Sequence, residues 1–123
     1  MEQKVCLDTD VVIAILNNED RAAQLINKIE QRTIFITTIT LFELLLRKTN
    51  LQVIETFREK AYVLEFDEDS VRKASVIFKE LEGKGKIIDI RDIFIVAISL
   101  ANGCSLATFN KKHFEHINQI ILI

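Results

Sequence analysis

The chain has 123 residues, of which 49% are hydrophobic and 28% charged, and its formal net charge is −2 at pH 7. We expect a single domain spanning residues 1–123, because a chain of this length forms one buried core. The slightly acidic balance argues against capture of nucleic acid by overall charge, so such binding would depend on local basic patches. The longest strongly apolar stretch, residues 93–101, is far shorter than the roughly 20 residues of a membrane span. We therefore expect no membrane association.

Helical and strand-like patterns alternate along the chain. Residues 89–102 are apolar nearly all round, but their length and acidic start favour a buried helix over a strand. Gly83 and Gly85 end the helical pattern before it. In chain order we predict a strand at 4–7, a helix at 19–32, a strand at 33–37, helices at 40–48 and 51–60, a strand at 62–66, helices at 67–82 and 89–102, a strand at 105–108, a helical turn at 111–116 and a last short strand at 119–123.

This alternation predicts an α/β fold. Parallel strands joined by right-handed crossovers give a three-layer α/β/α sandwich with a central parallel sheet of four to five strands. In such sheets the ligand crevice lies beyond the carboxyl ends of the strands, where the winding direction switches. The residues that directly follow strands are therefore the candidate site residues.

Acidic and amide side chains occupy several of these positions. Asp8 follows the first predicted strand, Asn110 follows the fourth, and Glu43 lies in the first turn of the helix after the second strand. Asp89 and Asp92 begin the buried helix. Carboxylates that share a crevice repel one another unless a cation binds between them. Oxygen ligands without Cys or His favour Mg²⁺ or Mn²⁺ over zinc.

Each acid also has a purely structural explanation, and the residues alone leave both open. Thr40-x-x-Glu43 fits a capping box. Asp89 fits an N-cap, with Asp92 complementing the helix dipole, and Asp8 could accept hydrogen bonds from the turn that follows it. Capping alone explains less well why two buried helices begin with acid and the first strand ends in one.

Cysteine use bears on the cellular compartment. Cys6 and Cys104 are the only cysteines, and each lies in an apolar segment. We expect two buried, reduced thiols, although two neighbouring thiols could also be cross-linked. The start of the chain is unlike a secretion signal, because Glu2 and Asp8 interrupt its apolar run. These features predict a cytoplasmic protein.

Four segments, taken together, resemble PIN-domain ribonucleases, and most closely the small single-domain toxins of VapC type. They are LDTDVVIAIL, TTITLFELL, GKIIDIRDIFIVA at 85–97 and LATFNKKHF. They occur in the family's order, and the resemblance runs over almost the whole chain. It implies a PIN-like domain that acts as a metal-dependent endoribonuclease, the toxin of a toxin–antitoxin pair.

The resemblance also assigns roles by position. Three carboxylates match the family's acidic triad and one amide matches its fourth position, which makes all four catalytic residues and ligands of Mg²⁺ or Mn²⁺: Asp8, Glu43, Asp92 and Asn110. Thr108 matches a small hydroxyl residue that borders such sites. Asp89 has no firm counterpart, and we expect it to cap its helix or support the site from the second shell of contacts.

Basic residues near the acidic ones are expected to contact RNA phosphates without reading sequence. These residues are Lys84, Lys86, Arg91, Lys111 and Lys112. We expect the neighbouring His113 to pack or cap rather than to catalyse. The resemblance further implies an RNA substrate, a cognate antitoxin protein that covers the cleft, and a homodimer.

Two other functions fit parts of the sequence. Asp8-Thr9-Asp10-Val11-Val12 also matches the opening motif of haloacid-dehalogenase-type phosphatases, in which Asp8 would be the nucleophile. That fold is usually longer, leaves Glu43 without a role, and places its last acidic pair after a strand. The third possibility is a catalytically weak PIN-like binding module, since Asn110 lowers the charge of the metal site.

Overall fold

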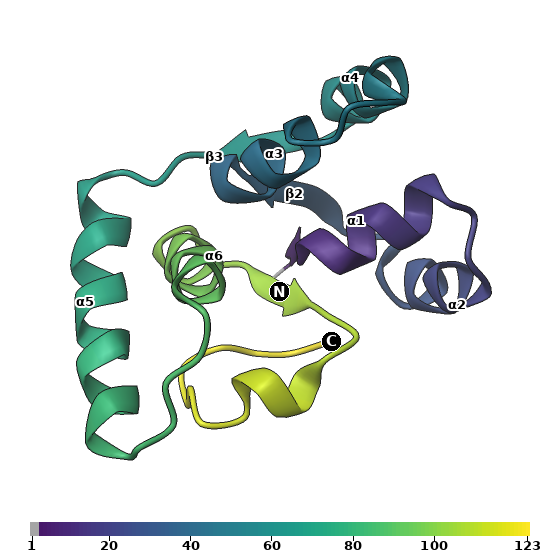
Figure 1. Cartoon of the computed structure of the whole chain (residues 1–123). Coiled ribbons are helices and arrows are strands. Elements are labelled where there is room, and N and C mark those ends of the chain that lie inside the picture. The colour runs from purple at the N-terminus through teal and green to yellow at the C-terminus, as the bar shows by residue number, and fades with distance from the viewer. Residues whose placement is uncertain (1–2) are drawn as a thin grey trace.

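The computed structural model describes residues 3–123. Within them, four short strands alternate with helices, and the elements carry the labels of Figure 1. The strands are β1 (Lys4–Leu7), β2 (Thr33–Thr37), β3 (Tyr62–Leu64) and β4 (Ser105–Ala107). The helices are α1 (Thr9–Leu16), α2 (Asp20–Ile29), α3 (Thr38–Leu45), α4 (Leu51–Lys60), α5 (Glu68–Gly83), α6 (Ile90–Ala101) and the 3₁₀ helix η1 (Lys111–Phe114).

The four strands form one parallel sheet in the order β3-β2-β1-β4. The chain winds outward from β1 to β3 and then crosses to the opposite edge of the sheet to form β4. Because crossovers are right-handed, this reversal places α5 and α6 on the face opposite α1 and α2, as Figure 1 shows. The predicted three-layer α/β/α sandwich is confirmed, with four strands in its sheet.

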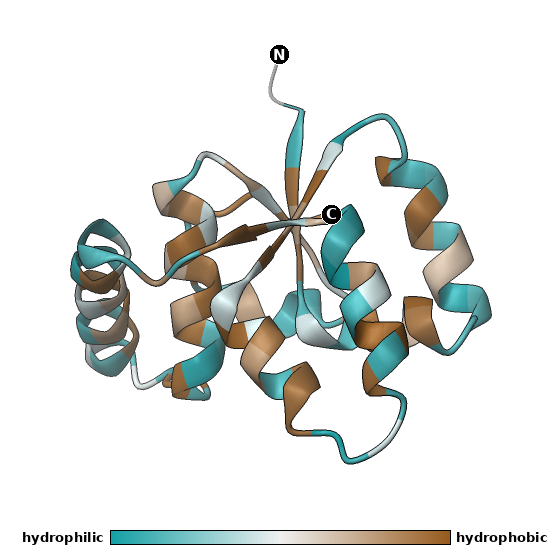
Figure 2. Ribbon diagram, turned by 90° about the horizontal axis from the view of Figure 1, so that it is seen from above, coloured by the Kyte–Doolittle hydropathy of each residue, from teal (hydrophilic) through white to brown (hydrophobic). Residues whose placement is uncertain are grey.

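The sheet is buried on both faces, and each face has its own hydrophobic core. Along β1, Val5 and Leu7 pack in the core with α1 and α2, whereas Cys6 packs in the core with α5 and α6. Alternate strand residues point to opposite faces, so one strand contributes to both cores. Figure 2 shows the helices on both sides of the strands, with hydrophobic segments toward the centre.

Helix α1 was not predicted. The sequence from Asp8 to Leu16 is mostly apolar and β-branched, and it gives little helical alternation of polar and apolar positions. Asp8 ends the strand and caps the helix in a single residue: its extended backbone precedes α1 and its side chain accepts a hydrogen bond from the Thr9 N–H. The turn between the two elements is therefore one residue long.

The last predicted strand is only partly formed. Residues 119–123 contribute one parallel bridge, from Leu122 to Leu106. Their backbone still bonds the exposed edge of β4, because the Leu106 N–H donates to the Ile121 carbonyl and the Ile123 N–H donates to the Leu106 carbonyl. The C-terminal segment thus covers an edge that would otherwise be open.

Both cysteines are buried and unbridged. Burial raises the pKa of the Cys6 thiol to about 12, so this thiol stays protonated and inert at neutral pH. The expectation of two reduced, buried thiols is confirmed. None of the helices in residues 3–123 combines the length and the hydropathy needed to cross a bilayer.

Candidate active site

A cleft of about 470 Å³ opens at the carboxyl edge of the sheet, beside the ends of β1 and β4. The switch in winding direction lies at these two neighbouring strands, which is where the topology predicts a ligand crevice. Side chains from four separate parts of the chain line it, including all four of the residues predicted as catalytic. The lining residues are Asp8, Thr9, Asp10, Ile13, Glu43, Leu46, Arg47, Arg91, Asp92, Asn110, His113 and Phe114.

Asp8 is the most enclosed acid in the cleft, with 8% of its surface exposed. One carboxylate oxygen accepts from the Thr9 N–H at 2.9 Å, and the other accepts from the Thr108 hydroxyl at 2.9 Å. Burial raises the pKa of Asp8 to about 6, and the negative charge of Asp92 adds to the rise, although the Thr108 hydrogen bond acts against it. The hydrogen bonds to Asp8 therefore do not offset the cost of burying its negative charge, and a bound cation would stabilise the ionised form.

Thr108 connects Asp8 to the segment that carries Asn110. Its hydroxyl donates to Asp8 and accepts from the Asn110 N–H at 3.1 Å. Its own backbone N–H donates to the Ile123 carbonyl at 3.3 Å. Thr108 is buried, so these contacts fix its hydroxyl at the border of the cleft, the place expected for it.

Glu43 faces the cleft and not its own helix end. Its carboxylate accepts from the Thr9 hydroxyl at 2.7 Å and forms an ion pair with Arg91 at 3.3 Å. The alternative of a Thr40–Glu43 capping box is wrong. The N-cap of α3 is Thr37, whose hydroxyl accepts from the Thr40 N–H at 3.1 Å. Since another residue caps the helix, the Glu43 carboxylate is available for the cleft.

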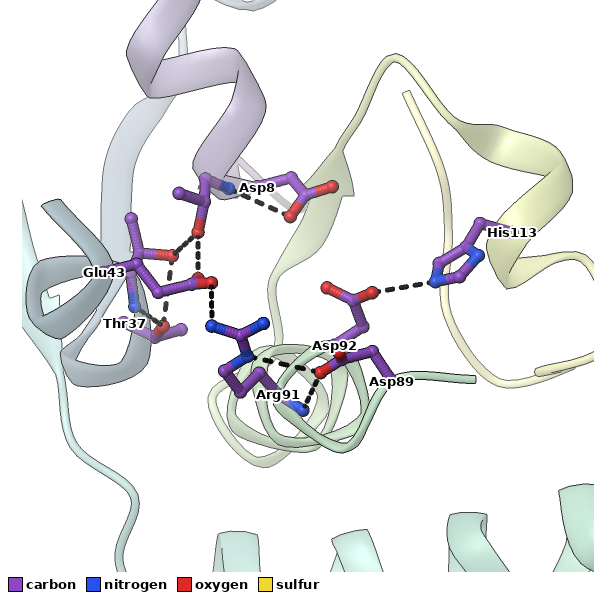
Figure 3. Close-up of polar contacts among 9 residues, drawn as sticks. Asp8, Thr37, Glu43, Asp89, Arg91, Asp92 and His113 are labelled. Atoms are coloured by element: carbon purple, nitrogen blue, oxygen red, sulfur yellow. Dashed lines mark hydrogen bonds and ion pairs between the residues drawn. The ribbon is translucent and has the colours of Figure 1, made fainter. Parts of the chain in front are cut away.

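Asp92 points into the same space as Asp8, as Figure 3 shows. It lies in the first turn of α6, and one of its oxygens contacts His113 Nε2 at 2.8 Å. No spacing pattern predicts this pair, because 21 residues separate its members. His113 therefore packs against the site, at the carboxylate expected to bind metal.

Asp89 caps α6, which is one of the two roles expected for it. Its side chain accepts from the Arg91 N–H at 2.9 Å and from Arg91 Nε at 3.3 Å. These hydrogen bonds hold the pKa of Asp89 below its ordinary value. The guanidinium of Arg91 consequently spans two acids, Asp89 on its own helix and Glu43 on α3 (Figure 3).

The donor chemistry fits a hard divalent cation, but not a preformed cage. Within residues 3–123, no three side chains of the Asp, Glu, His or Cys types are gathered closely enough to hold one ion. Two carboxylates, Asp8 and Asp92, face a common space, while Glu43 is engaged by Arg91. Mg²⁺ is often held by one or two carboxylates together with waters and substrate phosphates. The pair formed by Asp8 and Asp92 meets that requirement.

The residues expected to contact RNA are divided between two places. Arg91 lines the cleft, and Lys111 and Lys112 lie in η1 next to it. Lys84 and Lys86 lie in the connection between α5 and α6, where Lys84 donates to the His116 carbonyl at 3.0 Å. Neither of these two lysines lines the cleft.

Two polar residues of the cleft, Thr9 and Arg47, were not predicted from the sequence. Thr9 bonds both Glu43 and Thr40, whose hydroxyl lies 2.9 Å away. Arg47, after the end of α3, adds a second cation to the cleft. Thr9 could have been found from its place directly after Asp8, whereas Arg47 reads as one of several surface cations near the end of a helix.

Known proteins resemble this chain over the segments that line the cleft. The family model described as PIN domain matches residues 5–119. The chain is 26% identical over 121 residues to ribonuclease VapC1 of Methanocaldococcus jannaschii, covering 96% of this chain and 84% of that protein. It is 26% identical to a tRNA(fMet)-specific endonuclease VapC of Shigella flexneri, covering 93% and 92%. The DNA-bound VapBC structure from Salmonella typhimurium matches at 29% identity with a TM-score of 0.85, covering 100% of this chain and 98% of that chain.

The family match begins within β1 and ends after η1, so it includes every segment that lines the acidic cleft. It includes the Asp8–Val12 motif that also suggested a haloacid-dehalogenase-type phosphatase, and it assigns that motif to a different family. The fold, the cleft and the comparisons agree that the chain belongs to the PIN domain family.

Proposed function

We propose that this chain is an endoribonuclease that hydrolyses RNA phosphodiester bonds, and that it is the toxin of a toxin–antitoxin pair. The observation that carries the proposal is the convergence of Asp8, Glu43, Asp92 and Asn110 in one cleft from four separate parts of the chain. The VapC ribonucleases that the chain resembles support the reaction class. A cytoplasmic location belongs to the same proposal.

The proposed cofactor is Mg²⁺ or Mn²⁺, held by Asp8 and Asp92 with Asn110 completing the set of oxygen ligands. When bound, the cation polarises the phosphodiester and lowers the pKa of a water molecule. Side-chain contacts orient the two proposed carboxylate ligands: the Thr108 hydroxyl donates to one oxygen of Asp8, and His113 contacts one oxygen of Asp92. His113 contacts one oxygen of Asp92 and leaves the other toward the cleft, whereas both oxygens of Asp8 accept hydrogen bonds, from the Thr9 N–H and from the Thr108 hydroxyl.

Glu43 is proposed to orient and deprotonate the attacking water. The Thr9 hydroxyl sets the direction of its carboxylate, and Arg91 forms an ion pair with it. Arg91 lines the cleft and forms ion pairs with both Glu43 and Asp89, so it is the group proposed to contact the scissile phosphate. Contact with RNA would draw Arg91 away from Glu43 and leave that carboxylate to the water.

The proposed partner proteins are a cognate antitoxin and a second copy of this chain. Large apolar side chains are exposed along α3 and α4, namely Phe42, Leu45, Leu46, Leu51 and Val53. Contiguous exposed apolar residues are typical of protein interaction surfaces. Leu46 also lines the cleft, so a partner seated on this surface would reach the acids.

The decisive experiment incubates the purified chain with transfer RNA and other structured RNAs in Mg²⁺, in Mn²⁺ and in chelator. We expect cleavage with either metal, none in chelator, and at least a hundredfold loss in Asp8→Asn and Asp92→Asn. A phosphoaspartate trapped on Asp8 would favour the phosphatase. Growth inhibition that survives Asp8→Asn would favour the binding module, and either result would overturn the proposal.

A further inference from the structure

A second groove, of about 500 Å³, lies next to the acidic cleft, between α2 and η1. One wall comes from α2 and the other from the segment that runs from β4 into η1. Its lining residues are Arg21, Gln24, Leu25, Lys28, Thr108, Phe109, Asn110, Lys111, Lys112 and Ile123.

The side-chain charges of this groove are all positive. Arg21 and Lys28 stand on the α2 wall, and Lys111 and Lys112 stand on the opposite wall. No aspartate or glutamate is among the lining residues. In a chain whose formal net charge is −2, four cations around one groove form a local basic patch, which is the electrostatic requirement for binding a polyanion.

Arg21 is held over the groove by two contacts. Its Nε donates to Glu19 at 2.8 Å, and its guanidinium carbon lies 4.3 Å from the centre of the Phe109 ring. The ring contact and the ion pair restrict the guanidinium to one region, and the hydrogen bond to Glu19 uses Nε and not the two terminal nitrogens. The apolar floor under it, formed by Leu25, Phe109 and Ile123, suits the flat faces of nucleobases or ribose.

The groove and the cleft are adjacent. Asn110 lines both of them. Thr108 lines the groove and donates its hydroxyl to Asp8 in the cleft. A strand whose phosphate reaches Asp8 thus has the basic groove beside it, on the far side of Asn110.

We propose that this groove binds the phosphodiester backbone of the RNA on one side of the scissile bond, with Arg21 and Lys28 as phosphate contacts. The inference rests on the proposed ribonuclease function and adds a direction to it: the strand leaves the cleft across α2. Neither α2 residue was among the RNA contacts predicted from the sequence. Lys84 and Lys86, which were, lie outside the lining of both the cleft and the groove.

The test compares two double variants. Arg21→Gln/Lys28→Gln removes the α2 wall of cations, and Arg72→Gln/Lys79→Gln is the matched control on α5. Arg72, like Arg21, pairs with a nearby glutamate, here Glu68 at 2.7 Å. Helix α5 lies on the opposite side of the molecule from α2 (Figure 1). Both variants thus remove one paired arginine and one lysine from an exposed helix face.

Two readouts are needed: steady-state cleavage of a structured RNA in Mg²⁺, and RNA binding by fluorescence anisotropy in chelator across a salt series. For the α2 variant we expect KM and Kd to rise about tenfold with kcat within twofold. We expect its slope of log K against log salt to become shallower by about 1.4, the value for two lost contacts to a single strand. The α5 variant should match the wild type.

The possible failures are distinguishable. If the α2 variant retains the wild-type KM and salt slope while Asp8→Asn is inactive, the ribonuclease function stands and the groove proposal is overturned. If no RNA is cleaved by any form, the ribonuclease proposal fails, and the binding series alone decides the groove. Equal salt slopes for both double variants would then overturn it, and a shallower slope for the α2 variant alone would support it.

Discussion

Asp8 is a nearly buried carboxylate that accepts two hydrogen bonds but forms no ion pair with a cationic side chain of residues 3–123. Desolvation makes its ionised form costly, yet a hard metal ion needs that form. The same residue therefore lowers the stability of the metal-free chain and gains favourable interactions when a cation binds. This conflict between stability and binding is common at functional sites.

The first prediction concerns the pH dependence of stability. The pKa of Asp8 is about 6 in the folded chain against an ordinary value of 3.8, so the folded state binds this proton more tightly than the unfolded state. The free energy of unfolding should fall as pH rises from about 4 to above 6, by at most about 3 kcal/mol from this group. Urea unfolding in chelator at pH 4 and pH 7.5 measures the difference.

Asp8→Asn should remove that pH dependence and leave the chain more stable than the wild type at pH 7.5. The amide can still accept from the Thr9 N–H and can donate to the Thr108 hydroxyl. Identical pH dependence in the variant and the wild type would show that Asp8 is not the titrating group.

The second prediction concerns Arg91, which forms an ion pair with Glu43 in the metal-free chain. Removing the guanidinium in Arg91→Gln should free that carboxylate and tighten Mn²⁺ binding about two- to fivefold, the range for a partly exposed ion pair. Isothermal titration calorimetry gives the affinity. Arg47→Gln is the control, because Arg47 also lines the cleft but has no ion pair with Glu43. Equal gains in both variants would indicate a general charge effect.

At the scale of single residues, the sequence predicted which residues lie in the cleft better than it predicted which side chains they contact. Asp8 directly follows β1, Asn110 lies just after β4, and Asp92 lies in the first turn of α6. Glu43 lies near the end of α3 and not in its first turn, which was the position expected for it. The contact of Asp92 with His113 and the Arg91 bridge to Glu43 join segments 21 and 48 residues apart. Such pairings depend on how helices pack, which local patterns do not encode.

At the scale of elements, α3 begins with a buried hydroxyl network that also orients the site. Thr37 caps the helix through the Thr40 N–H, and the Thr40 hydroxyl lies 2.9 Å from the Thr9 hydroxyl, which in turn donates to Glu43. The cap and the cleft are thus linked through two threonines. We therefore expect a substitution at the cap to change both the stability and the activity of the chain.

The third prediction follows from this link. Thr37→Ala leaves the Thr40 N–H unsatisfied in a buried position, and should lower the free energy of unfolding by about 1–2 kcal/mol. Thr37→Ser keeps the hydroxyl and should lose less than half as much. Chemical unfolding of the three proteins gives the values. Equal losses in both variants would assign the effect to the missing methyl group and not to the cap.

Element types were predicted well where helical periodicity was long, as in α5, or where an apolar run was too long for a strand, as in α6. Element boundaries were less accurate: the strand predicted at 62–66 ends at Leu64, and the helix predicted at 40–48 spans Thr38–Leu45. Helix α1 was missed because its residues are apolar on nearly all sides and β-branched, and tertiary burial overrides that local preference. The capping box was misread because Thr37, three residues before Thr40, offered the same hydroxyl chemistry.

At the scale of the whole molecule, the cleft exists only in the folded chain, since Asp8 and Asp92 come from distant parts of the sequence. A ligand that binds only the folded state stabilises it by mass action, by about 2.7 kcal/mol at a hundred times its Kd. The same argument applies to any divalent cation bound between these two carboxylates.

The fourth prediction is that saturating Mg²⁺ or Mn²⁺ raises the Tm of the wild-type chain by several degrees, on the order of 10 °C at a hundred times Kd. Asp8→Asn and Asp92→Asn should lose most of this shift, and Glu43→Gln should keep more of it because Arg91 already holds Glu43. Asp10→Asn, at an exposed acid of the same cleft, should keep it fully. Thermal melts at constant ionic strength measure the shift, and a Tm that ignores divalent ions would contradict the proposed metal pair.

The strand order β3-β2-β1-β4 places the first strand to be made beside the last. A ribosome releases Asp8 long before Asn110, and the tail that braces Thr108 through the Ile123 carbonyl leaves later still. A growing polypeptide thus lacks an assembled acidic cleft until translation has passed all of these residues. A cell that makes a nuclease of this design is therefore protected from its activity while each copy is being synthesised, because the strand order delays assembly of the cleft.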